Sequence, residues 1–188
     1  MNKTKRIIFE SAIQVFSKAG YSGATMDDIA LNAGVAKGTL YYHFKSKEEI
    51  FNYIISTGFD VMKEEVVSAV SAEEDVLSKI RTMCKFQLKL VYENKDFFKV
   101  IMSQIWGQEL RQLELRKSIE DYLKTIESFL IEAMNHGVIK KGDSNFMSYT
   151  FFGTLCSAAV YELIHSDDMN VDRAIDNLMD YIFKGIQA

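Results

Sequence analysis

Residues 25–51 read TMDDIALNAGVAKGTLYYHFKSKEEIF, and this stretch decides how the N-terminal part of the chain folds. Thr25 is suited to cap a helix, and Asp28 stands three residues later, which is the spacing of a capping box. Gly34 provides the left-handed residue that ends this helix after about two turns. The stretch therefore predicts one short helix up to Gly34 and a second within residues 35–44.

The elements on either side of these two helices complete a recognisable unit. Ser46 and Glu49 repeat the capping-box spacing and predict a long helix over residues 46–67. Before residue 25, apolar residues recur every three or four positions and predict a first helix that ends at Gly20. Two short helices that pack on a preceding helix, joined by a turn containing glycine, form a helix-turn-helix.

The second short helix has one apolar side, formed by Leu40 and Phe44. A rotation of 100° per residue turns other side chains away from it. The residues expected to face outward are Gly38, Thr39 and Tyr42, with Tyr41 and His43 on the flanks. A threonine can contact a base edge, and tyrosine and histidine donors can reach phosphate oxygens. The outward side is therefore suited to DNA.

Two local features are unfavourable for this segment in the absence of a partner. Gly38 costs a short helix about 0.5–1 kcal/mol relative to alanine. Lys37 and Lys47 place positive charge at helix N-termini, against the helix dipole. A nearby phosphate would offset both effects, because it would neutralise the lysines and approach the backbone at Gly38.

The segment from Thr25 to Phe51 resembles the DNA-binding signature of the TetR family of bacterial transcriptional regulators, and the resemblance covers nearly all of residues 5–51. One departure is Ala36, where many members carry a capping Ser or Thr. By this resemblance, the residues that read bases are Lys37, Gly38, Thr39 and Tyr41. The residues that it implies hold phosphates are Thr25, Tyr42, His43 and Lys47.

Each of these features has an ordinary structural explanation when it is taken alone. An aromatic pair such as Tyr41 and Tyr42 usually belongs to a core or an interface, and a lone His43 is usually a surface residue. A capping box does no more than start a helix. It is their combined spacing within two short helices that favours DNA binding.

The rest of the chain predicts an all-α fold. The 188 residues contain no proline and are 48% apolar, so long helices can run uninterrupted around a proper core. Helical patterns cover about residues 73–92, 95–105, 108–136, 144–165 and 171–186. We predict a three-helix DNA-binding domain over residues 1–47 and a larger helical ligand-binding and dimerisation domain over residues 48–188, connected by the helix over 46–67.

Charge and composition restrict the class of protein without identifying it. The net charge is −4, but residues 1–50 hold seven Lys/Arg against five Asp/Glu, so the positive end is the N-terminus. No apolar run is long enough to cross a membrane, and the first residues lack a signal-peptide pattern, so we expect a cytoplasmic protein without a membrane partner. Cys84 and Cys156 are expected to be free, buried thiols.

The last two predicted helices are apolar on more than one side, so they need a second partner beyond the core. Small residues such as Gly153 and Ser157 would allow close helix approach. A two-fold interface between two copies fits this pattern, and the TetR resemblance implies the same homodimer. The interface residues that we expect are Phe151, Leu155, Ala158, Ala159, Leu178, Ile182 and Phe183.

The middle helices are rich in methionine and aromatic residues, which can line a pocket for a hydrophobic ligand but more often fill a core. The residues alone favour a core, whereas the TetR resemblance implies a bound inducer in this region. The candidate pocket residues are Met83, Phe86, Met102, Trp106, Tyr122, Phe129 and Phe152.

Three functions therefore compete. The first is a DNA-binding repressor that a small hydrophobic ligand releases, and the second is a DNA-binding protein whose helical domain engages another protein. The third is an all-α enzyme, which the sequence disfavours because His43, His136 and His165 lie in separate elements and no nucleophile or phosphate-loop motif occurs. We expect no catalytic residues, no metal and no cofactor. The partners that we expect are double-stranded operator DNA, an unidentified hydrophobic ligand and a second copy of the chain.

Overall fold

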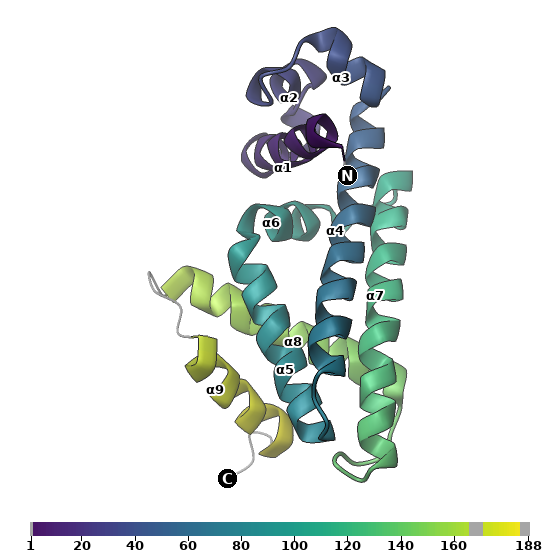
Figure 1. The fold of residues 1–188 in the computed structure, drawn as a ribbon, viewed down its shortest axis with the longest axis vertical. Coiled ribbons are helices and arrows are strands. Elements are labelled where there is room, and N and C mark those ends of the chain that lie inside the picture. The colour runs from purple at the N-terminus through teal and green to yellow at the C-terminus, as the bar shows by residue number, and fades with distance from the viewer. Residues whose placement is uncertain (1, 166–170, 185–188) are drawn as a thin grey trace. The chain divides into compact units, whose positions relative to one another are not determined.

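The computed structural model describes residues 2–165 and 171–184, and within these ranges it contains helices and no strand (Figure 1). The helices are α1 (Lys3–Gly23), α2 (Met26–Asn32), α3 (Lys37–His43), α4 (Lys47–Ser71), α5 (Val76–Glu93), α6 (Lys95–Gln104), α7 (Leu110–Asn135), α8 (Ser144–His165) and α9 (Val171–Lys184). The predicted all-α fold with an N-terminal helix-turn-helix is confirmed.

The chain divides into two compact units that do not follow the sequence in two simple halves. Unit 1 contains Met1–Asp60 and Asn94–Ile119, and unit 2 contains Val61–Glu93 and Glu120–Ala188. Helices α4 and α7 therefore each contribute to both units. The functional division at residues 47 and 48 stays a prediction, because it concerns roles rather than packing.

Unit 1 packs α1, α2, α3 and the first half of α4 around one apolar core, with α6 beside α1 (Figure 1). The core side chains are at most 2% exposed and include Ile8, Ala12, Phe16, Ile29, Leu40, Phe44, Ile50, Phe51 and Ile54. The Ser17 hydroxyl donates a hydrogen bond to Asp96 Oδ1 at 2.5 Å, which ties α1 to the start of α6. Gly58 leaves room for the ring of Phe97, since a Cβ atom there would overlap it.

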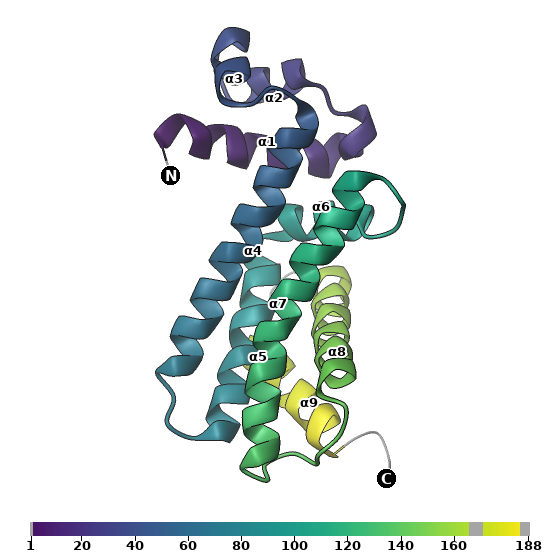
Figure 2. The same cartoon turned by 90° about the vertical axis from the view of Figure 1, so that its right-hand side faces the viewer.

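Unit 2 is built around α5, whose apolar stripe packs against α8 and α9 (Figure 2). Its buried residues are Ile80, Met83, Cys84, Gln87, Leu88, Leu90 and Val91. Ion pairs at the margin join Lys85 to Asp172 at 3.0 Å and Arg81 to Asp176. Both cysteines are free, as expected, but only Cys84 is fully buried, whereas Cys156 is half-buried. Burial raises the pKa of each thiol to about 12.

Helix ends agree with the sequence to within a few residues. The predicted helix over 144–165 matches α8, whereas α4 continues four residues beyond the predicted end at residue 67. At the end of the first helix, Gly20 has φ 70° and ψ 168°, so the regular helix is broken there although helical hydrogen bonding continues to Gly23. The predicted end at Gly20 is therefore three residues short of the end of α1 at Gly23, although the positive φ of Gly20 interrupts the regular helix at the predicted position.

Candidate nucleic-acid interface

Helix α2 is held at its N-terminus by the predicted capping box. Thr25 Oγ1 accepts a hydrogen bond from the Asp28 backbone N–H at 3.1 Å, and Asp28 Oδ2 accepts one from the Thr25 N–H at 3.0 Å. The helix ends at Ala33 before Gly34, which has φ 63°. These contacts are local, so both ends of α2 are defined by residues close to them in the sequence.

The second predicted capping box forms only in part. The Ser46 hydroxyl accepts a hydrogen bond from the Glu49 N–H at 3.1 Å, as expected. The Glu49 carboxylate, however, accepts from the Lys45 N–H at 2.6 Å. In a complete capping box this carboxylate would accept from the Ser46 N–H instead. The observed bond ties the start of α4 to the turn that follows α3.

Helix α3 turns the predicted side chains outward. Leu40 and Phe44 are buried at 0% and 2% exposure, whereas Tyr42 is 77% exposed and Tyr41 38% exposed. Gly38 and Thr39 are also exposed, and His43 is half-buried. The predicted orientation is confirmed, while the roles of these residues in reading bases or holding phosphates remain predictions. No side chain caps α3 at Ala36, as its sequence indicates.

The two lysines at helix starts have partners within the protein. The ammonium group of Lys37 lies 2.8 Å from a carboxylate oxygen of Asp27, which raises the pKa of Lys37. The ammonium of Lys47 donates to the carbonyl oxygens of Tyr21 and Ala24 at 2.6 and 2.8 Å. Groups within the protein therefore already offset both lysine charges, without the phosphate that the sequence suggested. Lys47 also stabilises the end of α1.

A cluster of cations surrounds Tyr21 at the end of α1. Lys47 Nζ lies 4.5 Å from the centre of the Tyr21 ring, and the guanidinium carbon of Arg111 lies 3.9 Å from it. Arg111 is buried and pairs with Glu109. Burial raises the pKa of Tyr21, against the lowering influence of Arg111. The cluster attaches the first helix to the start of α7 within unit 1 by cation–π contacts.

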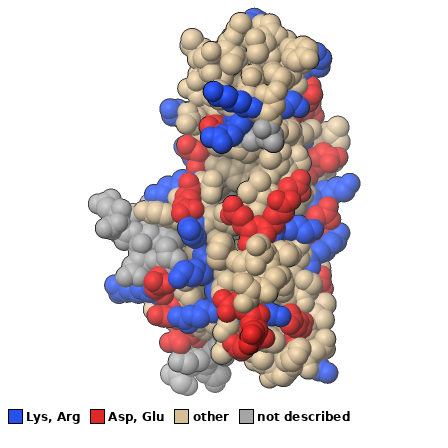
Figure 3. Space-filling view, viewed as in Figure 1, with Lys and Arg blue, Asp and Glu red and all other residues tan. Residues whose placement is uncertain are grey.

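Surface charge adds little to the case for DNA binding. On the face shown in Figure 3, the surface over α1–α3 is mostly uncharged, with scattered basic side chains over α1. The whole chain is acidic, at −4. The argument for a DNA interface therefore depends on the helix-turn-helix geometry.

Comparison with known proteins agrees with that geometry. Residues 8–54 match the family described as "Bacterial regulatory proteins, tetR family". A Clostridium perfringens structure, a candidate fatty acid metabolism regulator, is 45% identical, covers 97% of this chain and 99% of its own, and superposes with a TM-score of 0.90. The chain belongs to the TetR family of bacterial transcriptional regulators.

Two further comparisons describe this TetR-family regulator more closely. The fatty acid metabolism regulator protein of Bacillus subtilis is 28% identical over 95% of this chain and 93% of its own length. The structure of the B. subtilis regulator FadR in complex with stearoyl-CoA covers 97% of this chain and 99% of its own at 20% identity, with a TM-score of 0.86, and shows the shared fold. These relatives are regulators, in line with the expectation that the protein is no enzyme.

The seven predicted pocket residues are divided between the two units. Five belong to unit 2, where Met83 and Tyr122 are buried at 0% and 2% exposure and the other three are half-buried. The half-buried three are Phe86, Phe129 and Phe152. Met102 and Trp106 lie in unit 1 and are 42% and 82% exposed: the buried side of α6 is formed by Phe97, Val100 and Ile101, and Trp106 follows the end of that helix. We therefore leave these two out of the proposed pocket.

The predicted dimer residues differ in how exposed they are. Phe151, Leu155 and Leu178 are buried in their own unit, and Ala158 and Ile182 are half-buried. Ala159 and Phe183 lie outside the described side chains. Among the described side chains of α8 and α9, the large apolar residues that are exposed are different ones, namely Phe146, Tyr149, Val160, Tyr161, Ile164 and Tyr181. Phe151, Leu155 and Leu178 therefore face the core of their own chain, and the dimer interface itself stays a prediction.

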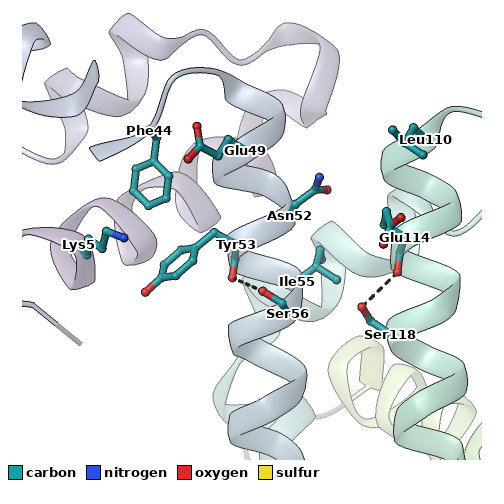
Figure 4. Close-up of a pocket in the computed structure, with 10 residues that line it drawn as sticks. All are labelled: Lys5, Phe44, Glu49, Asn52, Tyr53, Ile55, Ser56, Leu110, Glu114 and Ser118. Atoms are coloured by element: carbon teal, nitrogen blue, oxygen red, sulfur yellow. Dashed lines mark hydrogen bonds between the residues drawn. The ribbon is translucent and has the colours of Figure 1, made fainter. Parts of the chain in front are cut away.

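Unit 1 contains a groove of about 460 Å³ next to the helix-turn-helix (Figure 4). The residues that line it are Lys5, Phe44, Glu49, Asn52, Tyr53, Ile55, Ser56, Leu110, Glu114 and Ser118. Lys5 Nζ lies 5.5 Å from the Phe44 ring centre and 5.4 Å from that of Tyr53. Sequence patterns do not indicate this groove, because most of its lining residues lie on α1, α4 and α7, which are far apart in the sequence.

Several residues around the candidate sites were missed by sequence reasoning. Asp27 and Arg111 act through partners that lie ten or more residues away, so no local pattern identified them. Gln87 could have been noticed, because it interrupts the apolar stripe of α5 four residues after Met83. Among the described residues, no group of His, Cys, Asp and Glu could hold a metal. In the same part of the chain, no helix is long and apolar enough to cross a membrane.

Proposed function

We propose that this regulator is a cytoplasmic repressor that binds operator DNA as a homodimer and is released by a fatty acyl-CoA. The observation that carries the proposal is the 45% identity, over nearly the whole of both chains, to the C. perfringens candidate fatty acid metabolism regulator. The B. subtilis FadR structure contains stearoyl-CoA, and the structure of AibR contains isovaleryl coenzyme A together with operator DNA.

In this proposal, α3 lies in the major groove and its outward residues make the contacts. Lys37, Gly38, Thr39 and Tyr41 read bases. Thr25, Tyr42, His43 and Lys47 hold phosphates. Lys47 has three N–H donors, and the two carbonyl oxygens that it contacts leave the third for a phosphate.

The dimer that we propose uses the exposed side of α8. Phe146, Tyr149, Val160 and Ile164 follow one another at spacings that place them on one face, and their exposures are 71%, 46%, 37% and 71%. Exposed Gly153 and Ser157 lie between them, so that two such helices can approach closely. A second copy would also supply a second reading helix for a half-site about 34–36 Å away.

The dimer is tested by light scattering at micromolar concentration. The wild type is expected to have twice the 21.5 kDa mass of one chain. Ile164→Glu places a charge in the proposed interface and should give the monomer. Ile131→Glu is the matched control, because Ile131 is also an exposed isoleucine, at 41%, but lies on α7. A wild type that stays monomeric with and without DNA would exclude this interface.

The effector is tested on operator DNA that has first been selected from random sequence by the protein itself. Fluorescence anisotropy should show release of this DNA by stearoyl-CoA but not by free CoA. At one hundred times its dissociation constant, stearoyl-CoA should also stabilise the protein by about 2.7 kcal/mol. If neither acyl-CoA nor a broad set of hydrophobic molecules stabilises the protein, the result would favour the alternative function, in which the helical domain binds another protein.

A further inference from the structure

A polar side chain lies in the interior of unit 2 without a full set of partners. Gln87 of α5 is 2% exposed and sits within the buried stripe of that helix. Its Nε2 donates a hydrogen bond to the hydroxyl of Tyr122 on α7 at 3.0 Å. Its Oε1 is buried and accepts no hydrogen bond from any residue that the structure describes. The pair therefore leaves one strong acceptor unused.

The surroundings of this acceptor are apolar. Met83 lies one helical turn before Gln87 and is fully buried, and Tyr122 is 2% exposed. The Tyr122 ring packs edge-on against Phe152 of α8, with 5.9 Å between the ring centres. Three helices thus bring methionine and aromatic side chains to the amide, a lining that adapts readily to an apolar ligand.

An unpaired buried acceptor destabilises a fold, because the group loses its hydrogen bonds to water and gains none in return. Another buried glutamine shows the usual arrangement. Gln112, in unit 1, accepts from the Glu109 N–H at 3.0 Å and donates to the Trp106 carbonyl at 3.1 Å. Both ends of that amide are used, so Gln112 serves the fold. Gln87 has no such explanation, which points to a role in binding.

We propose that Gln87 Oε1 accepts a hydrogen bond from the effector, and that Gln87 and Tyr122 form the polar recognition group of the ligand site in unit 2. The ligand is then an amphipathic molecule whose apolar chain carries an N–H or O–H donor. This inference rests on the proposed function, in which the effector is a fatty acyl-CoA. Such a molecule can supply this donor in one of two ways: every acyl-CoA has amide N–H groups in its pantetheine arm, and a hydroxyacyl-CoA also has a hydroxyl group on the acyl chain.

The chemistry of Oε1 determines which ligands are rejected. A plain hydrocarbon would leave the acceptor unpaired in the complex, and a carbonyl oxygen would face it with a second set of lone pairs. A site with a buried hydrogen-bonding group discriminates strongly against analogues that lack the matching donor. Gln87 therefore selects for the ligand's polar group, while the apolar wall accommodates the chain.

The test compares three variants in the full-length protein. Gln87→Met replaces the amide with an apolar side chain of similar length, and Gln87→Met/Tyr122→Phe removes both polar partners together. Gln112→Met is the matched control at a buried glutamine outside the site. Titration calorimetry measures the affinity for stearoyl-CoA and for 3-hydroxystearoyl-CoA, and a thermal scan measures Tm without ligand.

Gln87→Met is expected to weaken ligand binding by about tenfold, the weight of one hydrogen bond in a dry site. The double variant should bind the ligand as weakly as Gln87→Met does. Its Tm should nevertheless be at least that of the wild type, and up to about 2–4 °C higher, because the unpaired acceptor has been removed. Gln112→Met should lower Tm and leave both affinities unchanged. A purely structural role for Gln87 would not give weaker binding together with equal or greater stability.

The two probes identify the donor. An equal loss for both probes assigns the pantetheine N–H, and a loss confined to 3-hydroxystearoyl-CoA assigns the acyl hydroxyl. Unchanged affinity for both, or a fall in the Tm of the double variant, overturns the proposal. If the wild type binds neither probe, the acyl-CoA proposal fails by itself, and the Tm of the double variant alone then decides whether the pair serves the fold.

Discussion

The helix-turn-helix of unit 1 and the interior of unit 2 use polar side chains in opposite ways. Around α2 and α4, polar groups stand at helix ends and pair with backbone, as Thr25, Ser46 and Lys47 do. In unit 2, the amide of Gln87 stands in the middle of a helix and is only half paired. Polar groups of the first kind stabilise a fixed surface. Those of the second kind leave an unused acceptor in the interior, where we propose that a ligand binds.

The same contrast concerns what the two regions offer to a partner. Helix α3 presents an exposed row that is already oriented, whereas the polar group of unit 2 is buried among apolar side chains. A preformed helix surface suits docking in the major groove of DNA, and an adaptable apolar interior suits the flexible acyl chain of the proposed effector. The following predictions separate the two regions experimentally, from the largest expected effect to the smallest.

Shortening a buried leucine in each unit should distinguish effects on stability from effects on DNA binding. Leu40→Ala in α3 and Leu130→Ala in α7 each remove a leucine that is at most 2% exposed, so each should cost about 2–5 kcal/mol of unfolding free energy. Only Leu40→Ala should also abolish DNA binding at a temperature where both variants remain folded. Urea unfolding and fluorescence anisotropy measure the two effects. An equal loss of DNA affinity in Leu130→Ala would contradict the division into two regions.

Gly58→Ala in α4 tests the close packing within unit 1. The added Cβ would overlap the Phe97 ring, which is only 7% exposed and also contacts Phe59. Overpacking of this kind costs about 1–3 kcal/mol and exceeds the gain of up to about 1 kcal/mol in helix propensity. The midpoint of urea unfolding should therefore fall. A higher midpoint would show that Phe97 can move aside without cost.

Gly38→Ala in α3 is the same substitution at another helical glycine, but here the stability should rise rather than fall. Nothing lies within 4 Å of a Cβ at this position, so the variant should be about 0.5–1 kcal/mol more stable. Its DNA affinity should nevertheless fall by about tenfold, because the methyl group would separate the helix backbone from the DNA. Unchanged affinity would mean that Gly38 does not contact DNA.

Asp75 provides the smallest effect and tests a helix cap in unit 2. Its carboxylate accepts hydrogen bonds from the Ser78 and Leu77 N–H groups at 2.9 and 3.0 Å, and the bond with Ser78 lowers the pKa of Asp75. Because the folded pKa is depressed, this stabilisation is present above the ordinary pKa of 3.8 and is lost as pH falls through the lowered value.

The corresponding variant is Asp75→Ala. Its unfolding midpoint in urea should lie below that of the wild type at pH 7, and the difference should shrink as pH falls below about 3.8. A difference that stays constant down to pH 3 would show that the charge of Asp75 contributes nothing to the cap.

The sequence by itself determined the parts of this protein that depend on near neighbours. The capping box at Thr25 and Asp28, the left-handed glycines and the outward turn of α3 all follow from residues a few positions apart. Helical bonding and capping act over three or four residues, so such features are encoded locally. The all-α fold and the TetR family can therefore be inferred from the order of the residues alone.

The tertiary structure alone decided the features that depend on distant residues. It placed Trp106 at the surface, turned Phe151 and Leu155 inward and brought Gln87 against Tyr122, thirty-five positions away. Periodicity shows that a helix has more than one apolar side but does not say which side meets its own core. That choice is made by packing between helices, and so the buried Gln87–Tyr122 pair and the exposed side of α8 became visible only in three dimensions.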